Sequence, residues 1–377
     1  MTETREQRLE RIAGAGDWVM KFAELAGQKG EPARSISFVG IEFLPLSYQQ
    51  LAEARLHVPV TVPLDWHNAR VLETDIPGVD IDKIARGHAT LESILSSTTV
   101  SLQRGGWLPS GLAVSRPGVT VLPDRNVVSQ IKTRYEGGAV VAPSRDFLDM
   151  LADLEVRINP LLFAMEGNDR GIPAPALVAA QLEQAVALIG KALPKATLAI
   201  SEQSLAGALG LIEDTRPGLA RKQAFLLEIA PALVSPTSRA LLDTRWQEVL
   251  EAADRHQVPR NSLVVLAALS AVAVPNSGSP AKKLLKFRPI YTAGDAYNAL
   301  ADLRSLEILI NLFALFPYER VALFTADRAL ALFWAGIQAH DFRRVGENAH
   351  FELAPVEALL PGDSLERWRD AVVDQSA

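Results

Sequence analysis

The sequence predicts an α/β protein: a short, mostly parallel sheet flanked by helices, with a large helical insertion and an N-terminal α+β segment. Two observations predict this class. Short apolar runs typical of strands lead directly into helix-type patterns, most clearly in VALFTADRALALFW at 321–334, and such alternation is typical of parallel sheets. The stretch 172–275 is dominated by helical patterns. We therefore divide the chain into an N-terminal segment of unassigned role, 1–115, and a domain, 116–377, in which 171–285 is mainly a helical insertion.

Composition indicates a globular protein with a substantial core. The chain has 377 residues, is 48% hydrophobic and contains no cysteine. This length is enough for two or three compact units. The absence of cysteine excludes disulfides, a thiolate nucleophile and a zinc site of the cysteine type, and it fits a reducing compartment. The net charge of −6 argues against a surface that binds nucleic acid throughout, so local basic patches must carry any such role.

The charged N-terminus and the modest length of the longest apolar run both indicate a cytoplasmic protein. The N-terminus, MTETREQRLERIAG, is charged from its start and lacks the apolar centre of a signal peptide. The longest apolar run, 263–274, spans about a dozen residues and falls short of the ~20 that a membrane-spanning helix needs. We therefore expect a buried helix there and no membrane association.

The first 115 residues contain patterns of both kinds. Residues 3–27 are typical of an amphipathic helix, 35–39 and 58–62 read as short strands, and the stretch around 80–97 reads as helical. None of these elements carries a pattern that we assign to chemistry.

The order strand, acid, helix becomes clear from residue 118. GVTVLP predicts a strand, and DRNVVSQIKTRY predicts a helix that Gly137 and Gly138 end. A helix follows from a cap at Ser144 to about Glu166, with a bend at Pro160.

The helical insertion and the C-terminal part also contain both strand and helix patterns. Within the helical insertion, 196–200 is a strand candidate. The loop VPNSGSP and the basic run AKKLLKFRP lead to a long helix over 291–316, and the final strand and helix are VALFTA and DRALALFWAGI.

Two of the predicted strand-to-helix junctions carry an aspartate, Asp124 and Asp327. In a parallel sheet these junctions lie at one edge, where α/β proteins build their sites. The long helix adds Asp295, Asn298 and Asp302, which share one face because they are spaced i, i+3 and i+7.

Glu166, at the end of the preceding predicted helix, can supply a fourth carboxylate. Carboxylates that converge in one cleft repel one another, and a hard divalent cation such as Mg²⁺ or Mn²⁺ relieves that repulsion through oxygen ligands. Such a site performs phosphoryl chemistry, because the metal activates water and stabilises charge on the phosphate.

Four short motifs in this order resemble the PIN-like domain nucleases. They are an Asp after the first strand with a polar residue two positions later, a helical Glu, an Asp that opens an alanine-rich helix, and T-x-D after the last core strand. In this sequence they read VTVLPDRNVV, FAMEGN, AGDAYNALADL and LFTADRAL. The match covers roughly 116–340, and about 130 residues separate its second and third motifs.

The resemblance implies a PIN-like core and a metal-dependent nuclease, more specifically an endoribonuclease, that hydrolyses phosphodiester bonds with a metal-activated water. Carried over position by position, it implies Asp124, Glu166, Asp295 and Asp327 as catalytic, metal-binding acids, with Asp302 as the substitute for Asp295 if the alignment is one turn out. The supporting polar groups implied are Asn126, Asn298 and Thr325. A role as an accessory toxin or in phage defence rests on the resemblance alone.

Each acid also has a simpler structural interpretation. Asp124 and Asp327 can cap the helices that follow them. Thr292 and Asp295 form a capping-box pattern, with Thr292 as the cap and Asp295 at the third helical position. Glu166 can be a solvated helix end. Capping and metal binding do not exclude each other, so the ordered set of acids favours a shared site.

Two basic groups are candidates for contact with RNA or single-stranded DNA. The first group precedes the long helix, and the second lies in the predicted helix that follows Asp124. They comprise Lys282, Lys283, Lys286 and Arg288 in the first and Lys132 and Arg134 in the second. Cations beside an acidic metal site would hold the nucleic-acid backbone.

Two other functions remain open from the sequence. One is a PIN-like module that no longer cleaves and acts in interaction or regulation, since fold does not guarantee activity. The other is a haloacid-dehalogenase-type phosphatase, suggested by Asp124 after a strand, although that chemistry needs an Asp where Asn126 stands. The six histidines show no paired metal spacing, and no glycine-rich phosphate loop is present. A protein regulator is compatible with the sequence, and the oligomeric state is not determined by it.

Overall fold

The computed structural model describes residues 19–23, 34–115, 118–167, 170–274 and 278–374. Its central feature is a six-stranded sheet with four parallel strands and an antiparallel pair at one edge. In spatial order the strands are β12 (Thr197–Leu198), β11 (Arg157–Ile158), β8 (Val119–Pro123), β13 (Arg320–Thr325), β6 (Val100–Gln103) and β7 (Gly106–Pro109). The prediction of a mostly parallel sheet flanked by helices is confirmed.

The strands β8 and β13 form the centre of this sheet. They run parallel, with Val121 opposite Ala322 and Leu122 opposite Leu323, and all four side chains are buried. Both strands are short continuous apolar runs, as expected for strands covered on both faces. Their pairing brings the carboxyl ends of two segments about 200 positions apart in the chain to one edge.

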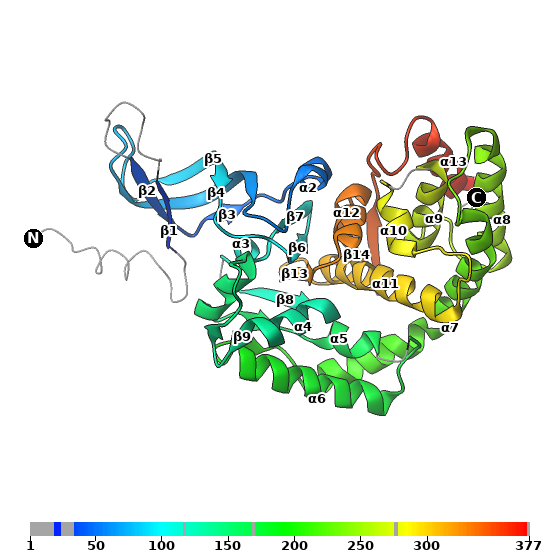
Figure 1. Cartoon of the computed structure of the whole chain (residues 1–377), viewed down its shortest axis with the longest axis horizontal. Helices are drawn as coiled ribbons and strands as arrows, with labels where there is room; N and C mark the ends of the chain where they lie inside the picture. The colour runs from blue at the N-terminus through cyan, green and yellow to red at the C-terminus, as the bar shows by residue number, and fades with distance from the viewer. Residues whose placement is uncertain (1–18, 24–33, 116–117, 168–169, 275–277, 375–377) are drawn as a thin grey trace, which may run out of the picture.

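Helices flank the sheet, and two of them directly follow strands, as the sequence predicted. After β8 comes α4 (Arg125–Arg134), and α12 (Arg328–Ile337) follows β13. The helices α5 (Leu161–Glu166) and α4 pack against β8, whereas α11 (Ala293–Leu315) packs against β13 and α6 (Pro175–Ala192) against α4. Figure 1 shows α4, α5 and α6 along one side of the molecule and α11 and α12 near its middle.

The N-terminal part is a five-stranded antiparallel sheet that lies at one end of the molecule in Figure 1. Its strands are β1 (Val19–Ala23), β2 (Ser35–Val39), β3 (Glu42–Phe43), β4 (Thr61–Thr74) and β5 (Ile84–Glu92). A short helix, α2 (Tyr48–Glu53), follows β3, and α3 (Ser110–Ala113) follows β7. This part therefore contains more strand than the sequence indicated.

Two predictions in this part were wrong. The expected helix around 80–97 is β5, which pairs along β4 and alternates between more and less exposed side chains, as a strand with one covered face does. The expected helix over 3–27 contains β1 at 19–23, and its other residues lie outside the described ranges. The strand expected at 35–39 is confirmed as β2.

The division at residue 115 does not coincide with an edge of the central sheet. β6 and β7 precede residue 115, yet they pair with each other and β6 pairs with β13. Arg328 of α12 also donates hydrogen bonds to the carbonyl oxygens of Leu51 and Ala54 at the end of α2. The N-terminal segment therefore supplies two strands and a helix contact to the domain that carries the acids.

Most of the helical insertion lies at the other end of the molecule in Figure 1, whereas its first helix, α6, lies along the same side as α4 and α5. The insertion contains α6, α7 (Glu202–Leu233), α8 (Leu242–Arg255), α9 (Leu263–Ala273) and α10 (Pro280–Leu285), with a short 3-10 turn at Arg239–Leu241. Every side chain of α9 is buried, as expected for a helix that is apolar on all sides. Among the described residues, no helix combines the length and the apolar character that crossing a membrane requires.

The long helix expected over 144–166 is three separate elements. Asp146 caps a 3-10 helix (Phe147–Asp153), β11 follows, and α5 begins after Pro160. The break arises because Arg157 and Ile158 pair with β8 on one side and β12 on the other. The prediction failed because this two-residue strand is too short to show a period of its own.

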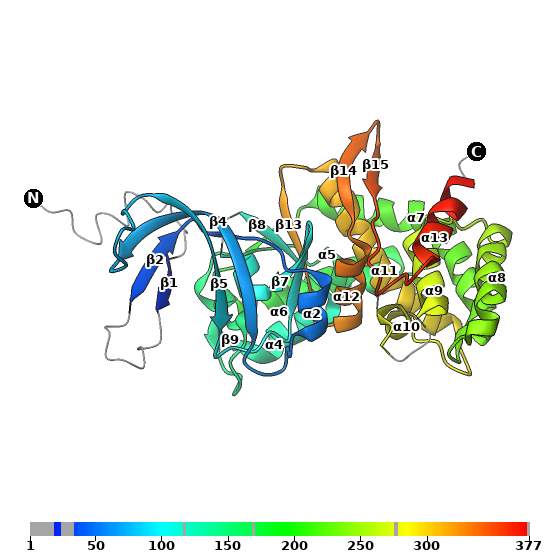
Figure 2. The ribbon, with the colours of Figure 1, turned by 90° about the horizontal axis from the view of Figure 1, so that it is seen from above.

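The C-terminal part adds a hairpin and a helix that the sequence did not indicate. β14 (His340–Val345) and β15 (Asn348–Glu352) form an antiparallel hairpin that projects from the body in Figure 2, and α13 (Ser364–Asp374) follows. A smaller hairpin, β9 (Tyr135–Glu136) and β10 (Ala139–Val140), turns at Gly137 and Gly138, both with positive φ.

Candidate active site

The carboxylates of Asp124 and Asp327 lie at the ends of the paired strands β8 and β13. Asp124 continues the strand pairing, since its N–H donates to the Phe324 carbonyl oxygen at 3.0 Å. Both residues are N-caps, as their simpler interpretation required. Asp124 Oδ1 accepts from the N–H of Val127 at 2.8 Å, and Asp327 Oδ1 accepts from Ala329 at 2.7 Å. Their capping role and their place at one edge are both confirmed.

Thr325 connects these two acids. Its side chain is fully buried, and its Oγ1 accepts a hydrogen bond from the Asp327 N–H at 2.9 Å. Its hydroxyl also hydrogen-bonds to the Asp124 carboxylate. The residue expected as a supporting polar group therefore holds both acids in position.

Glu166 ends α5 and is fixed from two sides. The Tyr297 hydroxyl, on α11, donates to the Glu166 carbonyl oxygen at 2.8 Å. Arg125, the first residue of α4, donates to the Gly167 carbonyl oxygen at 3.1 Å, and its guanidinium lies 4.4 Å from the centre of the Phe163 ring. These contacts link the end of α5 to the first turn of α4 and to α11, and Glu166 lines the same pocket as Asp124.

Asp302 is the acid that α11 contributes to this group. Lys286 Nζ lies 3.3 Å from Asp302 Oδ2 and 3.9 Å from Asp327 Oδ2, so one ammonium group lies between carboxylates of two helices. Lys286 is positioned for this contact by its left-handed backbone (φ 54°) at the end of α10. The lysine expected to contact substrate therefore lies among the acids themselves.

Asp295 lies outside the group, in contrast to its implied role as a metal ligand. Its carboxylate accepts hydrogen bonds from the N–H and hydroxyl of Thr292 at 2.9 and 2.8 Å and forms an ion pair with Arg288. The capping box read from the sequence is present. Asp302, seven residues further along the helix, takes the place of Asp295 in the candidate site, as the sequence analysis allowed.

The electrostatics of the acids show that they share one environment. Burial raises the pKa of Asp302 to about 7, and the nearby Asp327 and Glu166 add to this effect while Lys286 opposes it. Burial also raises the pKa of Asp124 to about 6, against the hydrogen bonds from Thr325 and Val127. Burial and the charge of Asp124 raise the pKa of Glu166, whereas Arg125 lowers it.

Lys286 shows the converse effect. Burial disfavours its charge, but the carboxylates of Asp302, Asp327 and Glu166 together raise its pKa above the ordinary value. The ammonium group therefore supplies positive charge to a cluster that would otherwise repel itself.

A pocket opens beside these acids and contains an arginine that the sequence did not single out. Asp124, Glu166 and Asp302 line it together with apolar side chains and Arg304 of α11. Arg304 is 8% exposed, its Nη2 donates to Thr215 Oγ1 of α7 at 2.9 Å, and its Nε has no hydrogen-bond partner among the described residues. Burial lowers its pKa. Nothing in the local sequence distinguishes this arginine from a surface one.

The other predicted residues lie as follows. Arg288 pairs with Asp295, and Arg134 pairs with Asp149 and donates to the Ser144 carbonyl oxygen, so both have structural partners. Asn126, Lys132 and Lys283 are exposed, whereas Asn298 and Lys282 are partly buried.

Comparison of the chain with protein-family models, with curated proteins and with solved structures gave no significant match. The protein therefore presents a mixed α/β architecture with a mostly parallel sheet and an acidic cluster at the carboxyl edge of that sheet.

Proposed function

We propose that this protein is a metal-dependent nuclease with a PIN-like core, and that it hydrolyses phosphodiester bonds in RNA. One observation carries the proposal: Asp124, Glu166, Asp302 and Asp327, from four different elements, converge at the carboxyl edge of β8 and β13. α/β proteins bind their ligands at this edge. Isolated helix caps would not require Glu166 and Asp302 to lie there as well.

The donor set suits Mg²⁺ or Mn²⁺. It consists of carboxylate oxygens, which are the ligands that these hard cations prefer. In Asp327 the cap uses Oδ1, whereas Oδ2 faces Lys286 and the other acids. Asp124, Glu166, Asp302 and Asp327 are the residues that would hold the ion. When bound, such an ion lowers the pKa of a water and stabilises negative charge on the phosphate.

Two cations of the chain suit the substrate's phosphates. Lys286 already lies 3.3 Å from Asp302, and its ammonium group is free to turn toward a phosphate once a metal neutralises the acids. Arg304 lines the same pocket, and its buried Nε has no hydrogen-bond partner among the described residues. A buried guanidinium without a carboxylate partner is costly, so an anionic ligand nearby would stabilise it. The exposed Lys283, in the same basic run, extends the positive charge to the surface.

The test is cleavage of labelled single-stranded RNA and DNA by the purified chain with Mn²⁺, Mg²⁺ or EDTA. We expect metal-dependent cleavage of RNA, lost in Asp124→Asn and in Asp302→Asn. Asp295→Asn is the matched control, because it removes the same charge from the same helix outside the site and should retain cleavage. Circular dichroism and thermal melting must show that all three variants are folded.

The non-cleaving module is the second candidate, and Lys286 is the observation that favours it. A lysine that permanently neutralises Asp302 and Asp327 would leave no place for a metal. Calorimetry distinguishes the two functions. Binding of Mn²⁺ that depends on Asp302 supports the nuclease, and no binding together with no cleavage supports the module. Turnover of a phosphomonoester without cleavage of RNA would instead indicate a phosphatase.

A further inference from the structure

The outer face of the β14–β15 hairpin collects metal-ligating side chains away from the acidic site. In the hairpin register, His340 lies opposite Glu352 and Arg343 opposite His350. Residues directly opposite in an antiparallel pair point to the same face, as do residues two apart on one strand. His340, His350 and Glu352 therefore share one face, and all three are partly or well exposed. On the other face Phe342 packs edge-on against Phe313 of α11.

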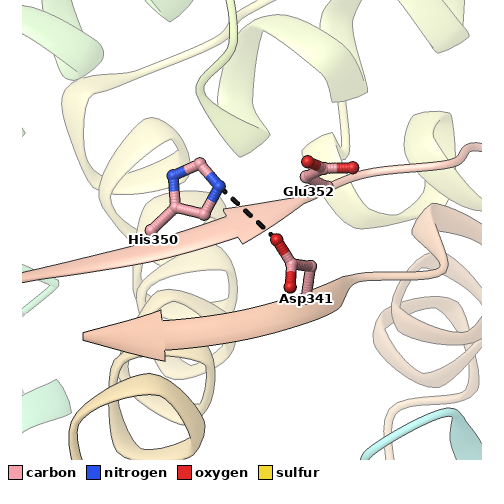
Figure 3. Close-up of side chains that lie close together, drawn as sticks. All are labelled: Asp341, His350 and Glu352. Carbon is pink, nitrogen blue, oxygen red and sulfur yellow. Dashed lines mark ion pairs between the residues drawn. The ribbon is translucent and has the colours of Figure 1, made fainter. Parts of the chain in front are cut away.

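A β-bulge brings a second carboxylate, that of Asp341, to this outer face. The register shifts between His340 and Arg343, and Asp341 has a left-handed backbone, with φ 50°. Bulges redirect a side chain in this way. As a result, Asp341, His350 and Glu352 each place one ligand atom so that all three atoms lie within 4.8 Å of one another. Figure 3 shows Asp341 on β14 facing the imidazole of His350, with Glu352 further along β15.

The hydrogen bonds of the two imidazoles direct lone pairs into this group. His350 Nε2 lies 3.0 Å from Arg343 Nη2, and because arginine can only donate, Nε2 is the acceptor. His340 Nδ1 lies 2.9 Å from the Gln338 carbonyl oxygen, which can only accept, so Nδ1 carries the proton. For neutral His340 this leaves Nε2 as the lone-pair nitrogen, 3.6 Å from the Glu352 carboxylate. A backbone carbonyl that fixes the tautomer is the usual support of a metal-binding histidine.

The cationic side chain of Arg343 already contacts two members of the group. Arg343 contacts both His350 Nε2 and, through Nε at 3.3 Å, Asp341 Oδ2. The guanidinium therefore contacts two of the atoms that would bind a metal. Its side chain is 57% exposed, so it can leave toward solvent without breaking a packed core.

We propose that Asp341, His350 and Glu352, with His340 as the adjacent fourth ligand, form a site for a divalent transition metal of the Zn²⁺ type, which displaces Arg343. Nitrogen and carboxylate donors in this number suit zinc, with ligand distances of about 2.0–2.2 Å. The observed separations are wider than a bound ion needs, and rotation of these exposed side chains closes them. Mg²⁺ is excluded as the preferred ion because it favours oxygen ligands alone.

The test uses the full chain freed of metal and titrated with Co²⁺, followed by visible absorbance. A Co²⁺ ion with imidazole ligands in a four-coordinate site absorbs strongly in the visible range, and the chain has no cysteine to confuse the spectrum. We expect a saturable band that Zn²⁺ abolishes stoichiometrically and that excess Mg²⁺ leaves unchanged. His350→Ala should weaken Co²⁺ affinity at least 100-fold, and Glu352→Gln at least tenfold. Arg343→Gln should strengthen it.

Two controls make the outcome decisive. His57→Ala removes an exposed histidine elsewhere and should not alter the titration. Asp302→Asn tests whether the ion binds the acidic site instead, and it too should leave the band unchanged. The proposal is overturned if wild type gives no saturable band, or if the band persists in His350→Ala or disappears in Asp302→Asn. The three hairpin variants change exposed or partly exposed side chains, and melting curves check that the hairpin remains folded.

Discussion

The ammonium group of Lys286 lies 3.3 Å from the carboxylate of Asp302, across two helices that meet at the edge of the central sheet. Lys286 follows the short α10 and Asp302 lies in the third turn of α11. The contact places one positive charge among partly exposed carboxylates, where it offsets their mutual repulsion. In the proposed metal site, the lysine and a divalent cation would compete for the same oxygens.

Lys286→Gln should therefore increase the affinity of the site for Mn²⁺ by about tenfold, because removing one unit charge at about 4 Å changes the interaction by at least about 1 kcal/mol. Isothermal titration calorimetry measures this change. Lys283→Gln, an exposed neighbour in the same basic run, is the control and should have a small effect. A weaker affinity in Lys286→Gln would show that the lysine supports the site rather than competing with the ion.

Asp302 and Asp295 should separate metal binding from helix stability. Asp302→Asn should abolish Mn²⁺ binding and leave the unfolding free energy similar or higher. Asp295→Asn should retain Mn²⁺ binding but lose about 1 kcal/mol of stability, since it weakens a capping box and the contact with Arg288. Calorimetry and urea unfolding of both proteins check the pair. The reverse pattern would restore Asp295 as the ligand.

The raised pKa of Asp302 predicts a pH-dependent difference in stability without metal. The carboxyl has an ordinary pKa of 3.8 in the unfolded chain and about 7 in the folded one. Below pH 3.8 it is protonated in both states and carries no penalty. As the pH rises toward 7 the unfolded chain ionises first, so this residue destabilises the fold increasingly.

Asp302→Asn should consequently melt a few degrees above wild type at pH 8 in EDTA, and at nearly the same temperature at pH 4. Differential scanning calorimetry at the two pH values measures the difference. Adding Mn²⁺ at pH 8 should raise the melting temperature of wild type only. Equal melting temperatures of the variant and wild type at pH 8 would mean that the Asp302 carboxylate does not destabilise the fold.

The close approach of β7 to the loop before α2 predicts a severe effect at one glycine. A Cβ on Gly106, whose φ is 152°, would lie 2.1 Å from the Leu46 carbonyl oxygen, which accepts a hydrogen bond from the Trp107 N–H. Gly106→Ala should lower the free energy of unfolding by more than about 3 kcal/mol, because the backbone must move to relieve this clash.

Gly105→Ala is the matched control for that change. Gly105 has a φ of 83° but open space around its Cβ position, so only the unfavourable backbone conformation remains, at roughly 1–2 kcal/mol. Urea unfolding gives both values. Similar losses in the two variants would show that the loop before α2 moves aside.

The parts of the site that depend on short-range patterns could be predicted from the sequence. β8 and β13 are uninterrupted apolar runs, and an aspartate directly after each is both a helix cap and a residue at the carboxyl edge. The capping box of Thr292 and Asp295 is likewise local, and the structure contains it. Position along one strand or within one helical turn is enough to fix these features.

The remaining features depend on contacts between distant segments. The choice of Asp302 over Asp295 depends on which turn of α11 meets the sheet edge, and both residues lie on the same helix face. The place of Lys286 depends on a left-handed residue at the end of α10, and Arg304 lies in the pocket because α7 packs on α11. The antiparallel strands β6 and β7 belong to the segment 1–115, which the sequence analysis set apart, yet they join the central sheet.

The separation of the acids along the chain has a consequence for biosynthesis. Asp124 and Glu166 leave the ribosome first, and Asp302 follows 136 positions after Glu166. At typical rates of about 5–20 residues per second, an incomplete chain carries only half of the cluster for roughly 7–27 s. If the chain is the ribonuclease proposed above, a nascent polypeptide that still lacks Asp302 and Asp327 would be unable to cut the message that encodes it.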